Sequence, residues 1–377
     1  PIMRVVSLII SQAVNDGATA VHIDPFEKSV RVRYRVGHLL HDVMEPPKHV
    51  QHAVVGRIKV LANLDISEWR IPQVGSINLT HDGRDFSVEV ATFPCLYGEK
   101  VVLRLTPGEG PNLCLERLGL SEVNRQKVRA ILERRLGLFL IVGPSRSGKN
   151  TILRALVRRL NEESRNIFSL EDSVLFTIEG VNQLELNPRA GLTAATALKS
   201  LMRGDPDVIS IDRRHGGETV RLAMEAAASR HLVFGARYAN DAAQGLRYIM
   251  EMGVENHLVA HALQGVWAQR LLPRLCEECK EWQAAPIDID GLEEDTPLCE
   301  ARGCPACRQT GFRGLVGVHE ILVSSPELQE AILRRAPAVE ISDLLDVSLR
   351  ADALEKLKDG QIGLPDYVAE FGRGEKS

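Results

Sequence analysis

The sequence predicts an α/β fold in which a domain with a parallel-rich sheet follows a smaller α+β domain and precedes a small cysteine-rich lobe and C-terminal helices. Three observations support this prediction. A loop containing glycines and a lysine separates an apolar strand from a helix at 143–151, strands and helices alternate after it, and two CxxC pairs lie within 276–307. The 377 residues exceed what one core usually covers, so two to three domains are expected.

The first domain is assigned to residues 1–106. It combines alternating apolar and polar residues, which indicate strands, with apolar positions that recur at helical spacing. The strand patterns lie at 21–23, 30–35 and 86–90, and the helical patterns at 2–15 and 50–63. The turn-rich segment Pro107–Pro111 follows, and it predicts a linker at 107–118.

The second domain is assigned to residues 119–270. Its apolar segments alternate with helical stretches, which is the pattern of a parallel sheet with crossover helices. The predicted strands are Leu138–Val142, Ile167–Leu170, Val208–Ile211 and Leu232–Phe234.

The loop after the first of these strands has the pattern of a phosphate-binding loop. Its residues are Gly143, Pro144, Ser145, Arg146, Ser147, Gly148, Lys149, Asn150 and Thr151. Backbone N–H groups and the N-terminus of a helix from Lys149 to about Leu160 would converge on phosphate oxygens, and the lysine would meet the outer phosphates. An ordinary turn is the alternative, but the strand before and the helix after favour nucleotide binding.

The cysteines predict a zinc-binding lobe at 271–322. Cys276, Cys279, Cys304 and Cys307 form two CxxC pairs, whose spacing suits a tetrahedral Cys₄ zinc site that is structural rather than catalytic. A redox pair or disulfides are the alternatives, but the missing export signal and the spare thiols are typical of a reduced cytosolic protein. Cys299 lacks a CxxC partner, so its replacing one of the four ligands is a weaker alternative.

The remaining segment, 323–377, is predicted to be helical, with helices at Pro326–Arg335 and Val339–Leu349.

Composition argues against two classes of function, membrane insertion and nucleic-acid binding. No apolar run approaches the ~20 residues that span a bilayer, so direct membrane insertion is not expected. A net charge of −4 and an aromatic content of 5% also argue against nucleic-acid binding. The chain starts at Pro1, and we interpret it as a processed product or a chain that lacks an upstream segment.

Several further motifs, taken with the loop and the cysteines, resemble the type II secretion and type IV pilus assembly ATPases. They are Ala20–Pro25, Arg33–Arg35, Arg57–Lys59, Ala62–Asp65, Tyr97–Lys100, Glu171–Asp172, Asn187–Pro188, Ala190–Thr193, Asp205–Asp207, His231–Val233, Asn240–Ala242, Ala268–Leu271, Gly311–Gly314 and Gly317–Glu320. The resemblance implies a RecA-like ATP-binding domain in a homo-oligomer, expected to be a hexamer. It also implies a cytoplasmic motor, peripheral to the inner membrane through partner proteins, that exports or assembles pilin-like subunits.

The chain departs from this family at positions that face the nucleotide. Asn150 stands where the family has a threonine that binds magnesium, so magnesium binding should be weakened. Arg213 replaces the glutamate that orients attacking water, and a guanidinium cannot act as a base. Asp212 is interpreted either as metal support or as a local partner of neighbouring arginines. Glu171 is the remaining candidate for a catalytic contact with water or metal, beside Lys149, although it could also be a surface residue at a strand end.

Other departures remove charge from the same region. Tyr238 replaces a family histidine, and Ser76 and Glu89 stand where the family has arginines that reach the nucleotide. Three functions are therefore weighed: a motor with weak ATP hydrolysis, an inactive scaffold or regulator related to such a motor, and, with least support, a nucleic-acid translocase. Whether this chain is an enzyme is left open by its sequence.

Overall fold

The structure is a computed structural model that describes residues 2–36, 39–107, 114–174, 176–212, 216–284, 289–293 and 296–373. Contacts divide the chain into two compact units. The first comprises Pro1–Asn112 with Ser173–Thr177, and the second comprises Leu113–Asp172 with Ile178–Ser377. Among the described helices, none combines the length and the apolar character that crossing a membrane requires.

The first unit is an antiparallel sheet covered by two helices. The strand order is β3 (Leu39–Met44), β2 (Val30–Val36), β1 (Ala20–Pro25), β6 (Gly98–Pro107), β5 (Arg84–Cys95) and β4 (Gln73–His81), with α1 (Ile2–Asn15) and α2 (Gln51–Leu61). Along β2, Val30, Val32 and Tyr34 are buried, and the Tyr34 hydroxyl donates a 2.8 Å hydrogen bond to the Ile9 carbonyl of α1. The alternation seen in the sequence thus separates a core face from a polar face.

The second unit is built on a parallel-rich sheet, which confirms the predicted fold class. The strand order is β15 (Phe312–Val323), β12 (Leu263–Leu275), β7 (Gly137–Val142), β11 (Leu232–Arg237), β10 (Val208–Ile211), β8 (Ile167–Glu171) and β9 (Asn182–Glu185). Neighbouring strands are parallel except β12 and β15, which are antiparallel. Every residue of β7 is buried, as expected for a strand at the centre of a covered sheet.

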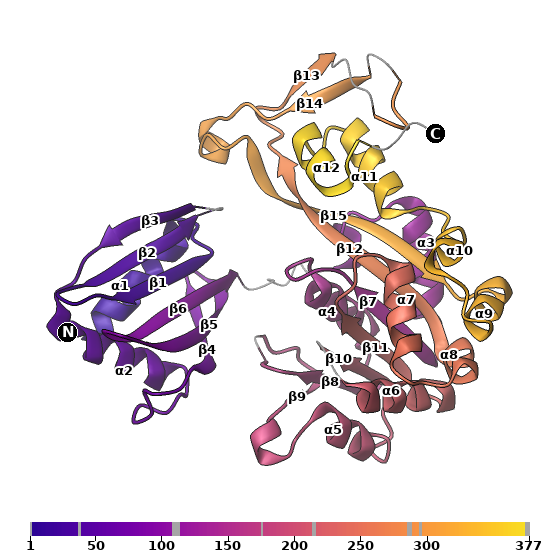
Figure 1. Ribbon diagram of the computed structural model, residues 1–377, viewed down its shortest axis with the longest axis horizontal. Helices are drawn as coiled ribbons and strands as arrows, with labels where there is room; N and C mark the ends of the chain where they lie inside the picture. Colours follow the sequence, from indigo (N-terminus) through magenta and orange to yellow (C-terminus); the bar gives the residue numbers. More distant parts are fainter. Residues whose placement is uncertain are drawn as a thin grey trace. The chain divides into compact units, whose positions relative to one another are not determined.

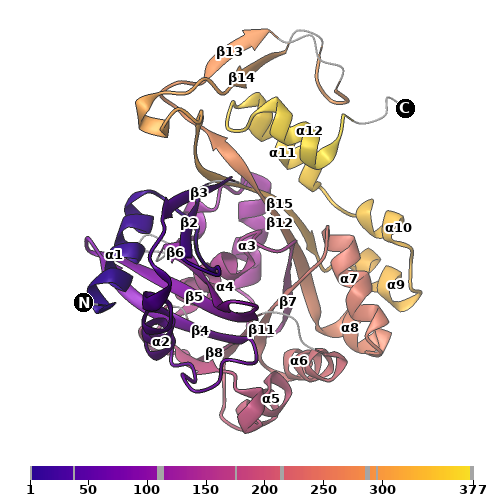
Figure 2. The ribbon, with the colours of Figure 1, turned by 60° about the vertical axis from the view of Figure 1, so that its left-hand side comes forward.

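Helices cover both faces of this sheet, as Figures 1 and 2 show. On one face, Phe139 and Ile141 of β7 pack in a core with α3 (Glu122–Leu132) and α4 (Lys149–Leu160). On the other, Leu138 and Leu140 pack in a core with helices that follow in the chain. These helices are α5 (Ala194–Leu201), α6 (Gly217–Ser229), α7 (Ala242–Glu251) and α8 (Asn256–Ala262).

The long strands β12 and β15 continue beyond the sheet to the cysteine lobe (Figure 1). The lobe contains the hairpin of β13 (Glu281–Ala284) and β14 (Pro297–Glu300). The chain then ends in α9 (Pro326–Leu333), α10 (Ala338–Ser342), α11 (Leu349–Lys358) and α12 (Leu364–Phe371). The prediction of one helix at Val339–Leu349 is wrong, because α10 ends at Ser342 and the Ser348 hydroxyl caps a new helix by accepting from Ala351 N–H.

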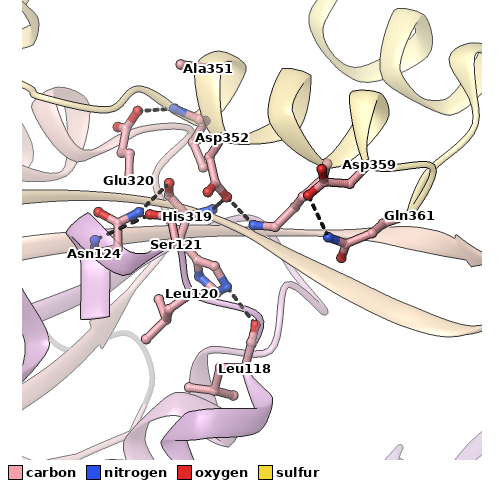
Figure 3. Close-up of polar contacts among 12 residues, drawn as sticks. Leu118, Leu120, Ser121, Asn124, His319, Glu320, Ala351, Asp352, Asp359 and Gln361 are labelled. Carbon is pink, nitrogen blue, oxygen red and sulfur yellow. Dashed lines mark hydrogen bonds and ion pairs between the residues drawn. The ribbon is translucent and has the colours of Figure 1, made fainter. Parts of the chain in front are cut away.

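A buried polar cluster on β15 joins several of these elements (Figure 3). The Glu320 carboxylate accepts 2.6 Å and 2.9 Å hydrogen bonds from the N–H groups of Ala242 and Leu349, the first residues of α7 and α11. Burial raises the pKa of Glu320, and these two N–H groups oppose that effect. One carboxylate therefore stabilises the N-termini of two helices.

The neighbouring His319 is fully buried and neutral. Trp267 Nε1–H donates to its Nδ1 at 3.2 Å, so the ring proton is on Nε2, which donates to the Leu118 carbonyl at 2.8 Å. Burial, with a contribution from the positive charge of Lys356, lowers the pKa of His319 to about 3. The His319 backbone N–H also donates to Asp352, which forms a buried ion pair with Lys356 of the same helix.

Replacing His319 should change how stability depends on pH. In the unfolded chain the imidazole takes up a proton as pH falls through about 6.5, whereas the folded protein resists protonation until about 3. Stability is therefore lost as pH falls through this window, by about 2 kcal/mol between pH 7.5 and pH 5.

We expect His319→Gln to lack this component when urea unfolding is measured at the two pH values. The exposed His257→Gln variant is the control and should keep the wild-type pH dependence. An unchanged difference between pH 7.5 and pH 5 in His319→Gln would contradict the assignment of a neutral buried imidazole.

Candidate nucleotide and metal sites

The loop 143–148 has the backbone of an anion site. It leaves the carboxyl end of β7 and enters α4 through Gly148, whose φ of 83° is left-handed and suits glycine. Among the described residues, no side chain caps the N-terminus of α4, and the dipole of the helix favours an anionic ligand there. The side chains of Ser145 and Arg146 are exposed, and Ser147 is buried beneath the loop.

Gln269 of β12 supports the loop through a hydrogen bond to its backbone. Its Nε2 donates to the Ser147 carbonyl, and its side chain is buried. A Cβ on Gly143 would lie 2.5 Å from the Gln269 carbonyl, and a Cβ on Gly148 would lie 2.4 Å from its Nε2. Both glycines are therefore required by the close approach of β12. The sequence motif Ala268–Leu271 contains Gln269, but its pattern gave no indication of this role.

Lys149 folds back over the loop. Its Nζ donates to the carbonyls of Gly143 and Pro144 at 3.0 Å and 2.6 Å. The ammonium is thus held on the side of the loop where phosphates would bind, and a phosphate would exchange with these carbonyls as acceptor. Thr151 is the third residue of α4.

Beside the loop, a small cavity brings together Asn150, Glu171 and Asp212, which were predicted from three separate segments, with further polar residues. It is lined by Asn150 and Arg154 of α4, Glu171 at the end of β8 and Asp212 just after β10, together with Ser169 and Ser210. Because the carboxyl ends of parallel strands meet at one sheet edge, β8 and β10 bring Glu171 and Asp212 to the N-terminus of α4. Arg154 was not selected from the sequence, where it resembles any exposed helical arginine.

Glu171 is buried rather than a surface residue, with 4% of its area exposed. Its Oε1 accepts hydrogen bonds from Ser169 Oγ at 2.9 Å and Gln183 Nε2 at 2.8 Å. The carboxylate is thus oriented by its own strand and by β9. Arg213, the predicted replacement for a catalytic glutamate, lies outside the described residues.

With its side chains in their present arrangement, the cavity does not fit a magnesium ion. Asn150 Nδ2 donates to Asp212 Oδ2 at 2.8 Å, so the donor end of the amide faces the carboxylate. A hard cation needs oxygen ligands, and here it would have to displace this hydrogen bond and turn the amide around. Arg154, whose side chain carries a permanent positive charge, also lines this cavity.

The four predicted zinc ligands lie together. Their sulfur atoms all lie within 4.8 Å of one another, and three of the distances are 3.7 Å, 3.7 Å and 3.9 Å. A tetrahedron with Zn–S bonds of about 2.3 Å has edges of about 3.8 Å. The sulfur atoms therefore already have the spacing that a zinc ion requires.

Backbone N–H groups complete this site. Gly303 donates to Cys279 Sγ, and Cys304 and Gly311 donate to Cys307 Sγ, at 3.1–3.3 Å. Burial raises the pKa of the Cys307 thiol, but the N–H groups of Cys304 and Gly311 and the neighbouring thiols lower it to about 6. The pKa of the Cys279 thiol is raised to about 12, mainly by burial. Zinc would replace the shared protons and bind all four as thiolates.

Cys299 lies apart from the four ligands. It is buried on β14, opposite Trp282 of β13. A Cβ on Gly360, at the end of α11, would lie 2.6 Å from Cys299 Sγ and 3.1 Å from the Trp282 ring. This cysteine therefore packs the β13–β14 hairpin against the C-terminal helices.

The other predicted departures are only partly buried. Tyr238 is 45% exposed, just after β11. In the first unit, Ser76 and Glu89 are cross-strand partners on β4 and β5, and Glu89 also pairs with Arg104 of β6 at 3.9 Å. The acidic residue therefore neutralises a basic neighbour on the polar face of that sheet.

Comparison with known proteins gives consistent relatives. The family model described as "Type II/IV secretion system protein" matches residues 1–369. Type II secretion system protein E of Pectobacterium carotovorum is 37% identical over 366 residues, which cover 96% of this chain and 74% of that protein. Type II secretion system ATPase E of Vibrio cholerae is 36% identical over 376 residues, covering 98% and 75%.

Solved structures agree in fold. The pilus retraction motor PilT with bound ADP superposes with a TM-score of 0.70 at 22% identity, covering 96% of this chain and 95% of that one. The ATPase DotB of Legionella pneumophila also gives a TM-score of 0.70, at 18% identity, covering 96% and 94%. At these identities the likeness supports the fold alone.

We predict that the purified protein contains one zinc ion per chain and that chelation destabilises the lobe. Elemental analysis should give ~1 zinc per chain in the wild type and less than half as much in Cys276→Ser or Cys304→Ser. Trp282 packs beside Gly360, so its fluorescence should change on chelation as the hairpin loosens. Cys95→Ser, at an exposed position in the first unit, is the matched control. Full zinc content in both ligand variants would contradict this site.

Proposed function

Since the chain belongs to the type II/IV secretion system protein family, we propose that it binds ATP at the loop 143–151 and couples nucleotide state to the export or assembly of pilin-like subunits. The observation that carries the proposal is the loop itself. Its glycines are held against β12, α4 begins directly after the loop without a side-chain cap from the described residues, and Lys149 donates to the loop carbonyls. These are the groups that cradle phosphates in P-loop proteins.

We further propose that hydrolysis is weak. The hydrogen bond from Asn150 to Asp212 sets the amide against metal binding, and Arg213 offers no general base. Glu171 is the remaining carboxylate in the cavity, but it is buried and already accepts two side-chain hydrogen bonds. Efficient phosphoryl transfer needs a metal and a positioned water, and the described residues that line the cavity offer no suitable set of ligands for either.

The assembly would follow from the family. We propose a homo-oligomer, expected to be a hexamer, at the cytoplasmic face of the inner membrane, held there by partner proteins of a secretion or pilus machine. The segments 1–106, 119–270, 271–322 and 323–377 would act as α+β domain, nucleotide domain, zinc lobe and helical end, joined at 107–118. The second candidate is an inactive scaffold or regulator, which the altered polar residues of the cavity favour.

Binding and turnover should separate in this protein. We expect the wild type to bind a fluorescent ATP analogue, and Lys149→Ala to bind it at least ~10-fold more weakly, because a charge-assisted phosphate contact is worth about 1.5–3 kcal/mol. Lys199→Ala removes an exposed lysine that pairs with Glu218 and should bind within ~2-fold of the wild type.

Steady-state phosphate release, measured on the same preparations, distinguishes the two candidate functions. Slow turnover that Lys149→Ala abolishes supports a weak motor, whereas binding without turnover supports the scaffold. If neither ATP nor ADP binds, the proposed function is wrong in both forms. Turnover at the tens per second of an efficient P-loop enzyme would contradict weak hydrolysis.

A further inference from the structure

Arg154 is an unusual residue for its position. It lies on α4 one turn after Asn150, so both project from the same side of the helix. Only 8% of its area is exposed, and an arginine is almost never buried so deeply without a partner. It lines the cavity that also contains Glu171 and Asp212.

The charges around this cavity explain why an arginine is tolerated there. Glu171 is 4% exposed and Asp212 is 8% exposed, and both come from the ends of neighbouring parallel strands. Two buried carboxylates need a compensating positive charge. In P-loop proteins an acidic residue at the end of a sheet strand meets the charge of the nucleotide-bound metal. Here Arg154, whose side chain carries a positive charge, lines the same cavity as the two carboxylates.

We propose that Arg154 supplies, as a fixed internal cation, the positive charge that a divalent metal provides in other P-loop proteins, so that nucleotide binding by this chain is independent of magnesium. This inference rests on the proposed nucleotide site. A guanidinium stays protonated at all accessible pH values and only donates hydrogen bonds. It therefore stabilises the carboxylates permanently and repels a second cation from the cavity.

The orientation of Asn150 follows from the same arrangement. With Arg154 compensating the carboxylates and no metal to ligate, the amide can turn its donor end to Asp212, at 2.8 Å. The asparagine and the arginine thus act together, one turn apart on α4.

The test compares nucleotide affinity with magnesium and with EDTA. ADP and ATP are titrated calorimetrically into the wild type, Arg154→Met, Arg154→Lys and the exposed control Arg159→Met. We expect the wild type and the control to bind within ~3-fold in the two conditions. Arg154→Met should bind at least ~10-fold more tightly with magnesium than with EDTA, since its carboxylates then recruit the ion. Arg154→Lys keeps the charge and should behave like the wild type.

Manganese binding gives a readout that needs no nucleotide. The electron paramagnetic resonance signal of free Mn²⁺ should persist when wild-type protein is added and should fall when Arg154→Met is added. Because a merely structural role of Arg154 would not create a metal site, this gain separates charge replacement from loss of packing. Circular dichroism confirms that each variant is folded, and Arg154→Lys provides a milder change if Arg154→Met does not fold.

Two outcomes would overturn the inference. In the first, the wild type binds nucleotide at least ~10-fold more tightly with magnesium than with EDTA, which means that it already uses a metal. In the second, Arg154→Met binds no manganese, which means that Arg154 was not what kept the metal out of the wild-type cavity. Failure of the proposed function gives a different result. In that case neither the wild type nor any variant binds nucleotide with magnesium or with EDTA, while manganese binding by Arg154→Met still shows that Arg154 excludes a metal from the cavity.

Discussion

The second unit depends on the burial of charged and polar groups on β15, where Glu320 and His319 contact α7, α11, β12 and the segment of Leu118. Glu320 accepts from the N-termini of α7 and α11, and His319 links Trp267 of β12 to the carbonyl of Leu118. Each group would be costly to bury alone, because an unpaired buried polar group loses its hydration without replacement. Fully paired, they fix the positions of the helices relative to the outer strands (Figure 3).

Strand β12 also connects the loop 143–151 to the cysteine cluster. β12 lies between β7 and β15, so it is hydrogen-bonded along both edges and cannot slide without breaking both ladders. Gln269 near its middle supports the phosphate loop, and Cys276 follows directly after its end. At about 3.3 Å per residue, the two lie about 23 Å apart on one rigid element. The cysteine lobe is thus anchored to the strand that supports the loop.

The sequence predicted those features that depend on local pattern. The strand, loop and helix at 137–160 and the four clustered cysteines were found where spacing placed them, because φ preferences and ligand geometry act over a few residues. The break in the predicted helix Val339–Leu349 was missed, since the Ser348 cap competes with an apolar pattern that continues through it. Gln269 and Arg154 were missed for another reason. Their roles depend on which residues surround them in the folded unit, and the local sequence does not distinguish a buried arginine or glutamine from an exposed one.

The cavity beside the loop shows why retained and altered residues can coexist in one site. In the proposed nucleotide site, phosphates would meet backbone groups of the loop, whose positions are set by Gly143, Gly148 and β12 rather than by the side chains of Asn150 or Asp212. Chemistry at the terminal phosphate depends instead on side-chain charge, which a single substitution can reverse. Once a helical arginine compensates the buried carboxylates, restoring a threonine at Asn150 alone would not restore a metal site, because the arginine would still repel the ion. In the proposed site, nucleotide binding would therefore depend on the backbone of the loop, whereas hydrolysis would depend on the side-chain charges of the cavity.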